Sequence, residues 1–218
     1  MADWDDDSPR LHANLNAVLN ELAAQAPRRR RFCVEDAREW QRKTMTGLQV
    51  PDASYVGAFR GEHGLEDVEV VIGSAYGMPA VAVATELAAF ETTLVAIVEQ
   101  LDARYPNSDD LDTDGLEAVI DLAAWAHAEW VRIHPFANGN GRTARLWANA
   151  IFMRYGIEPV IHLRPRPAHG YGSAGAAAMR VDWLPTAAAF RRLLGEHYGT
   201  RRPLASRAKK KKPPPRGP

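Results

Sequence analysis

The stretch HPFANGNGRTAR, residues 134–145, brings together a basic imidazole and residue types that can bind an anion. His134 precedes a proline and a phenylalanine and lies beside a flexible turn that favours anions. Arg142 and Arg145 are three residues apart, which places both guanidinium groups on one side of a helix, where they can bind phosphate. The stretch therefore predicts a basic side chain beside a bound phosphate group.

The residues before this stretch predict a helix that ends at the histidine. Apolar residues recur at helical spacing over 116–131, and Asp114 with Glu117 three residues later predicts the N-terminal cap. Pro135 pushes the preceding residue out of the helical conformation, so the helix should end at or near His134. The imidazole then faces whatever the following loop binds.

The loop after the histidine leads into a second predicted helix. Gly139 and Gly141 permit positive φ and a close approach of the backbone to a ligand. Residues 142–156 have the pattern of a helix that Gly156 closes. Its unpaired N–H groups and the positive end of its dipole would point to a common position, so the loop predicts a phosphate site.

Other interpretations of the polar residues are weaker. Residues 139–144 fit the dinucleotide-binding pattern G-x-G-x-x-A, with Glu158 further along, but that motif follows a strand and here helical spacing precedes it. His127 lies on the apolar stripe of the first helix and is predicted to be a hydrogen-bonded core histidine. His162 and His169 are predicted loop residues rather than metal ligands.

The composition predicts one soluble globular domain, because the 218 residues are 46% hydrophobic and 25% charged. The start, MADWDDDSPR, lacks the basic and apolar regions of a signal peptide, and no uncharged apolar run approaches the roughly 20 residues that span a bilayer. Cys33 is the only cysteine, so no intrachain disulfide is expected. These features predict a cytoplasmic protein without a membrane segment.

The net charge of zero conceals an uneven distribution. Residues 201–218 hold eight basic residues and no acid, which leaves 19 basic against 27 acidic residues in 1–200. The body therefore does not resemble a nucleic-acid binder, and only the basic, proline-rich tail would contact nucleic acid. A disordered and solvated tail is the stronger interpretation. The run Arg28–Arg31 is predicted to lie in an exposed loop.

The remaining chain predicts a mainly α-helical fold. Apolar residues at helical spacing indicate helices near 11–22, 35–45 and 79–105. Between the second and the third, VEVVIG at 68–73 is short and β-branched, and SAYG and MPAVAV follow it. This segment predicts a small β-hairpin or flap.

The central stretch resembles the signature of the Fic (Fic/Doc) family, H-P-F-x-(D/E)-G-N-G-R-x-x-R. The resemblance continues in WQRKTMTGLQVPDASYVGAFR, in the flap VVIGSAYGMPA and in YGSAGAAAMRVDWLPTAAAFRRLL. It covers residues 36–198 as a Fic domain, with an N-terminal helix and basic loop in 1–35 and a tail in 199–218. The matching signature residues are His134, Pro135, Phe136, Gly139, Asn140, Gly141, Arg142 and Arg145.

The resemblance implies a Fic-type helical bundle with a hairpin flap that transfers AMP from ATP to a serine, threonine or tyrosine hydroxyl of another protein. His134 would be the general base, and Phe136 would anchor the loop in the core. The residues 139–141 with Arg142 would hold the phosphates, and Arg145 would contact the γ-phosphate. The flap, Val68 to Pro79, would align the protein substrate as an added strand; otherwise it is an ordinary hairpin that covers the core.

Asn138 departs from the family pattern, which has an aspartate or glutamate that binds Mg²⁺ at this position. An amide oxygen can still coordinate a hard cation but brings no negative charge, so Asn138 should bind the metal more weakly. The alternatives are therefore transfer of phosphate or another phosphate-linked group on the same fold, or a catalytically silent nucleotide-binding interaction module.

No stretch matches the inhibitory pattern (S/T)-x-x-x-E-(G/N) that many family members carry. Thr113 to Glu117 comes closest, but Ala118 follows it and a helix start explains it better. The resemblance therefore implies either a separate, antitoxin-like inhibitor or the absence of this type of restraint.

Overall fold

The computed structural model describes residues 4, 6–72, 75–168 and 170–199, so the predicted tail lies outside the described residues from 200 onward. The expectation of a mainly α-helical bundle with a small hairpin is confirmed. The described elements are α1 (Pro9–Gln25), α2 (Val34–Thr44), β1 (Val71–Ile72), β2 (Ala75–Tyr76), α3 (Ala80–Arg104), α4 (Thr113–Ile133), α5 (Asn140–Arg154), α6 (Tyr171–Ala178) and α7 (Leu184–Gly199), with short 3-10 helices at Ala26–Arg28, Ala53–Tyr55 and Ser108–Asp110.

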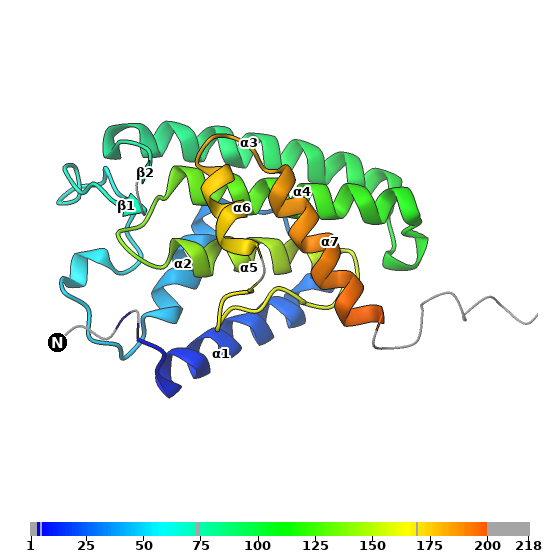
Figure 1. Cartoon of the computed structure of the whole chain (residues 1–218), viewed down its shortest axis with the longest axis horizontal. Coiled ribbons are helices and arrows are strands. Elements are labelled where there is room, and N and C mark those ends of the chain that lie inside the picture. The colour runs from blue at the N-terminus through cyan, green and yellow to red at the C-terminus, as the bar shows by residue number, and fades with distance from the viewer. Residues whose placement is uncertain (1–3, 5, 73–74, 169, 200–218) are drawn as a thin grey trace, which may run out of the picture.

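The helix α4 lies in the middle of the bundle. It contacts α3, α5, α6 and α7, and in Figure 1 it runs beside α3 with α6 and α7 in front of it. The predicted apolar stripe is correct but incomplete, because Leu122, Ala124, Ala126 and Ala128 are buried on other sides of the helix. Small alanine side chains let several neighbouring helices approach the same axis.

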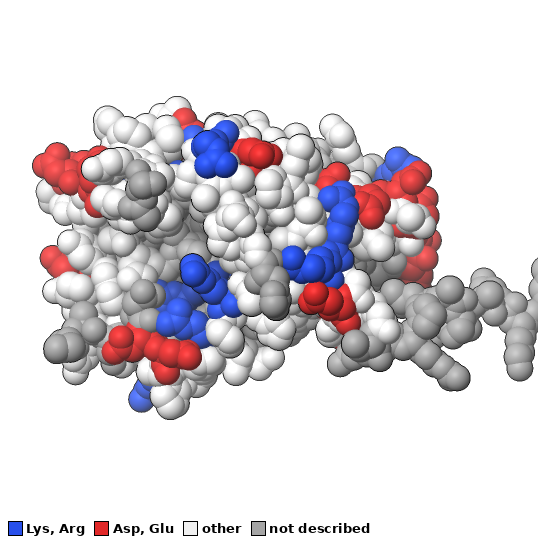
Figure 2. Space-filling model, in the orientation of Figure 1, with Lys and Arg blue, Asp and Glu red and all other residues white. Residues whose placement is uncertain are grey.

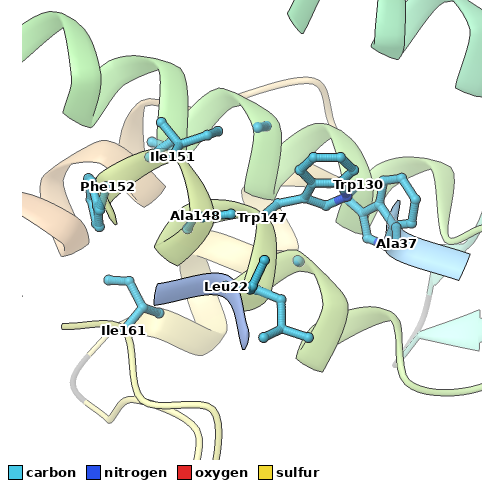
Figure 3. Close-up of a cluster of buried hydrophobic side chains, with 14 of the residues drawn as sticks. Leu22, Ala37, Trp130, Trp147, Ala148, Ile151, Phe152 and Ile161 are labelled. Carbon is cyan, nitrogen blue, oxygen red and sulfur yellow. The ribbon is translucent and has the colours of Figure 1, made fainter. Parts of the chain in front are cut away.

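The core is built around two tryptophans (Figure 3). Trp130 of α4 and Trp147 of α5 are both 0% exposed, with ring centroids 5.7 Å apart. Trp40 of α2 and Phe90 of α3 pack on Trp147 at 4.7 and 5.5 Å between centroids. Four helices therefore meet at one side chain, which fixes α5 and the loop before it relative to α4.

The helix α1 belongs to the same core. The Ser8 hydroxyl accepts a hydrogen bond from the Leu11 N–H at 3.1 Å, and Pro9 occupies the first helical turn, so the start of α1 is capped. Leu11, Leu15 and Val18 are buried against the central cluster. The predicted amphipathic helix is confirmed.

The cap of α4 differs from the expectation. The residue before the helix is Asp112, not Asp114, and its side chain accepts a hydrogen bond from the Gly115 N–H at 2.7 Å. The Tyr105 hydroxyl donates to the same carboxylate at 2.9 Å and holds it in the capping position. The cap therefore lies two residues before the predicted position, where the contact with Tyr105 holds the carboxylate.

The run Arg28–Arg31 is an exposed loop except at Arg29, where the expectation is wrong. The Arg29 side chain is only 18% exposed and donates to the Tyr105 carbonyl at 2.6 Å. Arg154 at the end of α5 donates to the carbonyls of Arg29 and Arg30 at 2.9 and 2.7 Å. The basic loop is therefore packed against the C-terminal end of α5.

One helix among the described residues, α3, is long and apolar enough to cross a membrane by length and composition alone. This is weak evidence for a membrane span, because core helices of soluble proteins pass the same test. The helix contains Glu86, which pairs with Arg132 of α4, and its buried face packs in the central cluster. One face of α3 is thus packed against the bundle.

Candidate active site

His134 ends α4 in a left-handed backbone conformation, with φ of 53° and ψ of 56°. Its N–H donates to the Trp130 carbonyl at 3.0 Å, so α4 ends at the residue that Pro135 predicts. The ring Nδ1 lies 3.0 Å from the Val131 carbonyl oxygen. Because a carbonyl can only accept, Nδ1 carries the hydrogen, and Nε2 has the lone pair that a general base needs.

Burial, together with the nearby positive charge of Arg60, lowers the pKa of His134 to about 4. The hydrogen bond to the Val131 carbonyl acts in the opposite direction, because it favours the protonated ring. The imidazole is therefore neutral at neutral pH and ready to accept a proton.

Arg60 organises the surroundings of His134, a role that the sequence analysis missed. The side chain is fully buried and donates from Nε to the His134 carbonyl at 2.8 Å, and from a terminal nitrogen to the Ile133 carbonyl at 3.1 Å. Other donors contact the carbonyls of Val68 and Met78, at the two ends of the flap, at 3.1 and 2.7 Å. One guanidinium thus joins the end of α4 to the base of the flap.

The loop between α4 and α5 is closed by two reciprocal hydrogen bonds. The Asn140 amide oxygen accepts from the Phe136 N–H at 2.8 Å, and the amide nitrogen donates to the Phe136 carbonyl at 2.7 Å. The Phe136 ring is 0% exposed and lies 4.9 Å from Phe59 between centroids, which agrees with its predicted role as an anchor. Contact of Asn140 with phosphate stays a prediction.

The start of α5 has the backbone form that an anion site needs. Gly139 precedes the helix with φ of 93°, a conformation that favours glycine. The first N–H groups of any α-helix have no acceptor within the helix, so those of Asn140 and Gly141 can contact a ligand.

The two predicted arginines are buried beside this helix start. Arg142 is 3% exposed and donates to the Asn138 side-chain oxygen at 2.7 Å and to the Trp4 carbonyl at 2.8 Å. Arg145 is 5% exposed and donates to the Leu163 carbonyl at 2.9 Å. Its Nε has no hydrogen-bond partner among the described residues.

Two adjoining cavities meet at His134. We call the first the polar wing, with a volume of about 550 Å³; it is lined by residues 69–71, His134, residues 137–142, Arg145, Arg164 and Arg166. The second, the apolar wing, has a volume of about 600 Å³, and its lining comes from β1, β2, α4, α5 and α6 together with Arg166 and Arg180. His134, Gly141, Arg145 and Arg166 line both wings.

The structure therefore brings the predicted site residues together. His134, Asn138, Gly139, Asn140, Gly141, Arg142 and Arg145 all line the polar wing, and Phe136 lies behind it in the core. Figure 2 shows a hollow on one face of the molecule, with basic side chains gathered below it and acidic ones beneath them. This face combines a proton acceptor, an anion site and an apolar chamber.

Arg164 and Arg166 are further residues that the sequence analysis missed. They lie in the loop between α5 and α6, in the sequence RPRP, and both line the polar wing. Arg164 pairs with Asp7 of the N-terminal segment at 3.3 Å. The sequence signal for these residues was the alternation of arginine and proline. Proline restricts the backbone, so such a loop can hold its arginines in fixed positions at a site.

His127 is a hydrogen-bonded core histidine, as predicted. It is 3% exposed, its Nε2 forms a hydrogen bond with the Tyr171 hydroxyl, and burial lowers its pKa to about 3. Both residues also line the apolar wing, so this pair forms part of the chamber wall. Burial raises the pKa of Tyr171, which keeps the hydroxyl protonated.

The residues of the polar wing do not fit a charged magnesium site. The side-chain oxygen of Asn138, the predicted ligand, faces the guanidinium of Arg142. Among the described residues that line the wing, Glu69 is the only acidic one, and its carboxylate accepts from the Ala80 N–H at 3.1 Å and pairs with Arg60. Within the described part of the chain, no three His, Cys, Asp or Glu side chains gather into a group that would hold a metal ion.

Thr113 to Glu117, the nearest match to the inhibitory pattern, has a structural role. Both residues lie in the first turns of α4, and the Glu117 carboxylate pairs with Arg191 of α7 at 2.7 Å. This agrees with the interpretation of the segment as a helix start.

The family of the chain follows from comparison with known proteins. The model of the Fic/DOC family matches residues 31–152, more than half of the chain, so this chain belongs to the Fic/DOC family. A protein adenylyltransferase Fic of Nematostella vectensis is 56% identical over 52 residues, which are 24% of this chain and 12% of that protein. Protein adenylyltransferase fic-1 of Caenorhabditis elegans is 60% identical over 42 residues, 19% of this chain and 8% of that protein. These names support a transferase role, although the matches span only a small part of each relative.

Solved structures show the same fold. A Fic domain containing signaling protein from Bacteroides thetaiotaomicron aligns with a TM-score of 0.52 and 23% identity, over 87% of this chain and 73% of that one. Fic-1 from Caenorhabditis elegans aligns with a TM-score of 0.54 and 24% identity, over 90% of this chain and 55% of that one.

Proposed function

We propose that this chain is a protein adenylyltransferase that transfers AMP from ATP to a side-chain hydroxyl of a target protein. The observation that carries the proposal is the position of His134, whose ring has its lone pair on Nε2 and lies where the two wings meet. The polar wing suits a phosphate chain, and the apolar wing suits a nucleoside. The names of the relatives support the same activity.

In the proposed reaction, the target hydroxyl oxygen attacks the α-phosphorus of ATP as Nε2 of His134 takes the hydroxyl proton. A new bond forms between that oxygen and the α-phosphorus, the bond to the bridging oxygen of the β-phosphate breaks, and pyrophosphate leaves. Arg142, Arg145 and the N–H groups at the start of α5 stabilise the negative charge that develops on the phosphate oxygens. The burial of both arginines supports this role, because a site arranged before the substrate binds needs little rearrangement during the reaction.

The low pKa of His134 in the free protein is compatible with this role. Negative charge nearby favours a protonated ring, so a bound triphosphate raises the pKa of His134 and stabilises the imidazolium as it forms. Arg60 holds the ring at the end of α4 through the His134 carbonyl.

The proposed partner is a protein whose extended segment docks along the flap, where Val71 and Tyr76 are 63% and 68% exposed. A separate inhibitor that resembles an antitoxin and a cytoplasmic location are parts of the same proposal. The inhibitor rests on the family resemblance, and the location rests on the sequence features that predicted a cytoplasmic protein.

The test uses ATP labelled separately on the α-phosphate and on the γ-phosphate. Purified protein and a cell lysate are incubated with each, beside His134→Ala and a control, His162→Ala, in which an exposed loop histidine is removed. We expect protein labelling only from the α-position, lost in His134→Ala and retained in His162→Ala. Labelling only from the γ-position would replace AMP transfer with phosphate transfer, and no label from either would indicate an interaction module.

A further inference from the structure

We propose that this site binds its nucleotide through four arginines and needs no divalent cation for binding. The inference rests on the proposed nucleotide site and concerns how the phosphate charge is balanced there. Two of the arginines, Arg142 and Arg145, belong to the helix that begins the site, and two, Arg164 and Arg166, come from the following loop.

The first observation is the chemistry at position 138. The Asn138 side-chain oxygen accepts a hydrogen bond from a terminal nitrogen of Arg142 at 2.7 Å. A cation bound at this oxygen would lie beside a guanidinium, and the two positive charges would repel each other. An acidic side chain would offset this repulsion, but an amide does not. The position therefore favours contact with an arginine over contact with a metal ion.

The second observation is Arg145, a buried cation that lines both wings. It is 5% exposed, it donates to the Leu163 carbonyl and contacts the Tyr171 hydroxyl, and its Nε has no partner within the described residues. Burial of a charge is costly unless an opposite charge or further hydrogen bonds compensate for it. A phosphate group in the wing supplies both.

The third observation is the loop that carries Arg164 and Arg166. Arg164 already holds a carboxylate, that of Asp7, and the Asp7 side chain is 61% exposed, so a phosphate can displace it at little cost. Arg166 lines both wings and is exposed. Pro165 and Pro167 restrict the backbone on either side, which limits the entropy lost when the loop arginines bind.

These positions make the polar wing strongly basic. Among its described lining residues are four arginines and one acidic residue, Glu69, which is engaged at the base of the flap. A guanidinium group is always charged, and it can donate two parallel hydrogen bonds to the oxygens of one phosphate group. A site of this kind attracts free ATP more strongly than ATP whose charge is partly cancelled by Mg²⁺. The arginines thus take the place of the charge that a metal would supply.

The experiment is calorimetric titration of ATP into the full chain carrying His134→Ala, so that no nucleotide is consumed. One buffer contains EDTA and the other excess Mg²⁺, at equal ionic strength. We expect the Kd in EDTA to be equal to or lower than the Kd in Mg²⁺. Binding that is weaker in EDTA by about tenfold or more would overturn the inference.

Two double variants test whether the loop arginines contribute to ATP binding. The double variant Arg164→Gln with Arg166→Gln should raise the Kd for ATP by about tenfold in EDTA. The increase in Kd should be smaller in Mg²⁺. The matched control, Arg30→Gln with Arg104→Gln, removes two exposed arginines outside both wings and should leave the Kd unchanged. Equal Kd values for the two double variants would overturn the role of the loop arginines.

Asn138→Asp provides the opposite test, because it places a carboxylate at the same position. This variant should bind ATP more tightly in Mg²⁺ than in EDTA, which reverses the order expected for the parent. An unchanged order would contradict the role assigned to Asn138.

The outcomes separate this inference from the proposed function. Binding only in Mg²⁺ would overturn the inference and leave the adenylyltransferase proposal standing. No binding in either buffer would overturn both.

Discussion

At the scale of the residue, two contacts determine the protonation of His134. The Val131 carbonyl fixes the hydrogen on Nδ1, and burial beside Arg60 lowers the pKa of the ring to about 4. We expect the His134 resonance in an NMR titration of the nucleotide-free protein to change with a midpoint near pH 4. A midpoint near 6.5, the ordinary value for histidine, would contradict the described burial.

Nucleotide should move this midpoint upward, because a bound triphosphate places negative charge beside the ring. The same titration with saturating ATP on Arg142→Ala, which lacks one phosphate contact, is the control. A midpoint that does not rise with ATP on the parent chain would place the phosphates away from His134.

Arg60 is the second residue whose replacement is informative. Arg60→Lys keeps the charge, but a single ammonium cannot contact carbonyls on α4 and at both ends of the flap. We expect the free energy of unfolding to fall by about 2 kcal/mol or more, since buried carbonyls lose their donors. Urea unfolding measures this loss.

The catalytic consequence of Arg60→Lys is separable from its effect on stability. At a temperature where the variant is folded, kcat should fall by about tenfold, because His134 and the flap lose their common support. The KM for ATP should change much less, since Arg60 does not line either wing. A change in KM alone would contradict the positioning role.

At the scale of the element, two glycines of α6 form part of the wall of the apolar wing. Gly172 and Gly175 both line this wing, and a Cβ atom added at either would meet nothing within 4 Å. Gly175→Leu should therefore fill the chamber. We expect it to weaken ATP binding by about tenfold or more, measured by calorimetry, and to leave the helix at least as stable.

The control for this prediction is Gly195→Leu in α7. A Cβ atom at Gly195 also meets nothing within 4 Å, but the residue is exposed and does not line either wing. It should raise helix stability slightly and leave ATP binding unchanged. Equal binding by the two leucine variants would show that the nucleoside lies elsewhere.

At the scale of the whole molecule, two buried histidines make stability depend on pH. The pKa values of His127 and His134 are lowered to about 3 and about 4 in the folded chain, from 6.5 in the unfolded chain. At a pH between the folded and the unfolded pKa values, the unfolded state binds more protons than the folded state. The free energy of unfolding therefore decreases as the pH falls from about 6.5 toward 4. We expect a decrease of about 2 kcal/mol per histidine between pH 7 and pH 5.

Urea unfolding at both pH values measures this difference. His127→Gln removes one titrating ring and retains an amide that can reach the Tyr171 hydroxyl, so it should remove about half of the pH dependence. The same pH dependence in this variant would exclude His127 as its source.

Much of the site was predictable because its information is local. Pro135 restricts the backbone of His134, and glycine at position 139 permits the turn. The spacing of Arg142 and Arg145 places both side chains on one side of the helix. The existence and order of the main helices followed from the period of their apolar residues for the same reason.

The start of α4 shows where such local information ends. Asp114 with Glu117 fits the capping pattern, but Asp112 forms the cap, and the Tyr105 hydroxyl, seven residues away, holds its carboxylate. A contact outside the local pattern therefore decides where the helix begins.

The sequence by itself determined the family and the helical class, and it predicted His134 as the base and the signature arginines as phosphate contacts. Only the tertiary structure decided that Arg60 supports His134 across 74 residues and that Arg164 and Arg166 line the polar wing. It also decided that the Asn138 oxygen faces Arg142. The physical reason is that backbone preferences and helical spacing act within a few residues, whereas the partner of a charged side chain is whatever the packed core brings within reach.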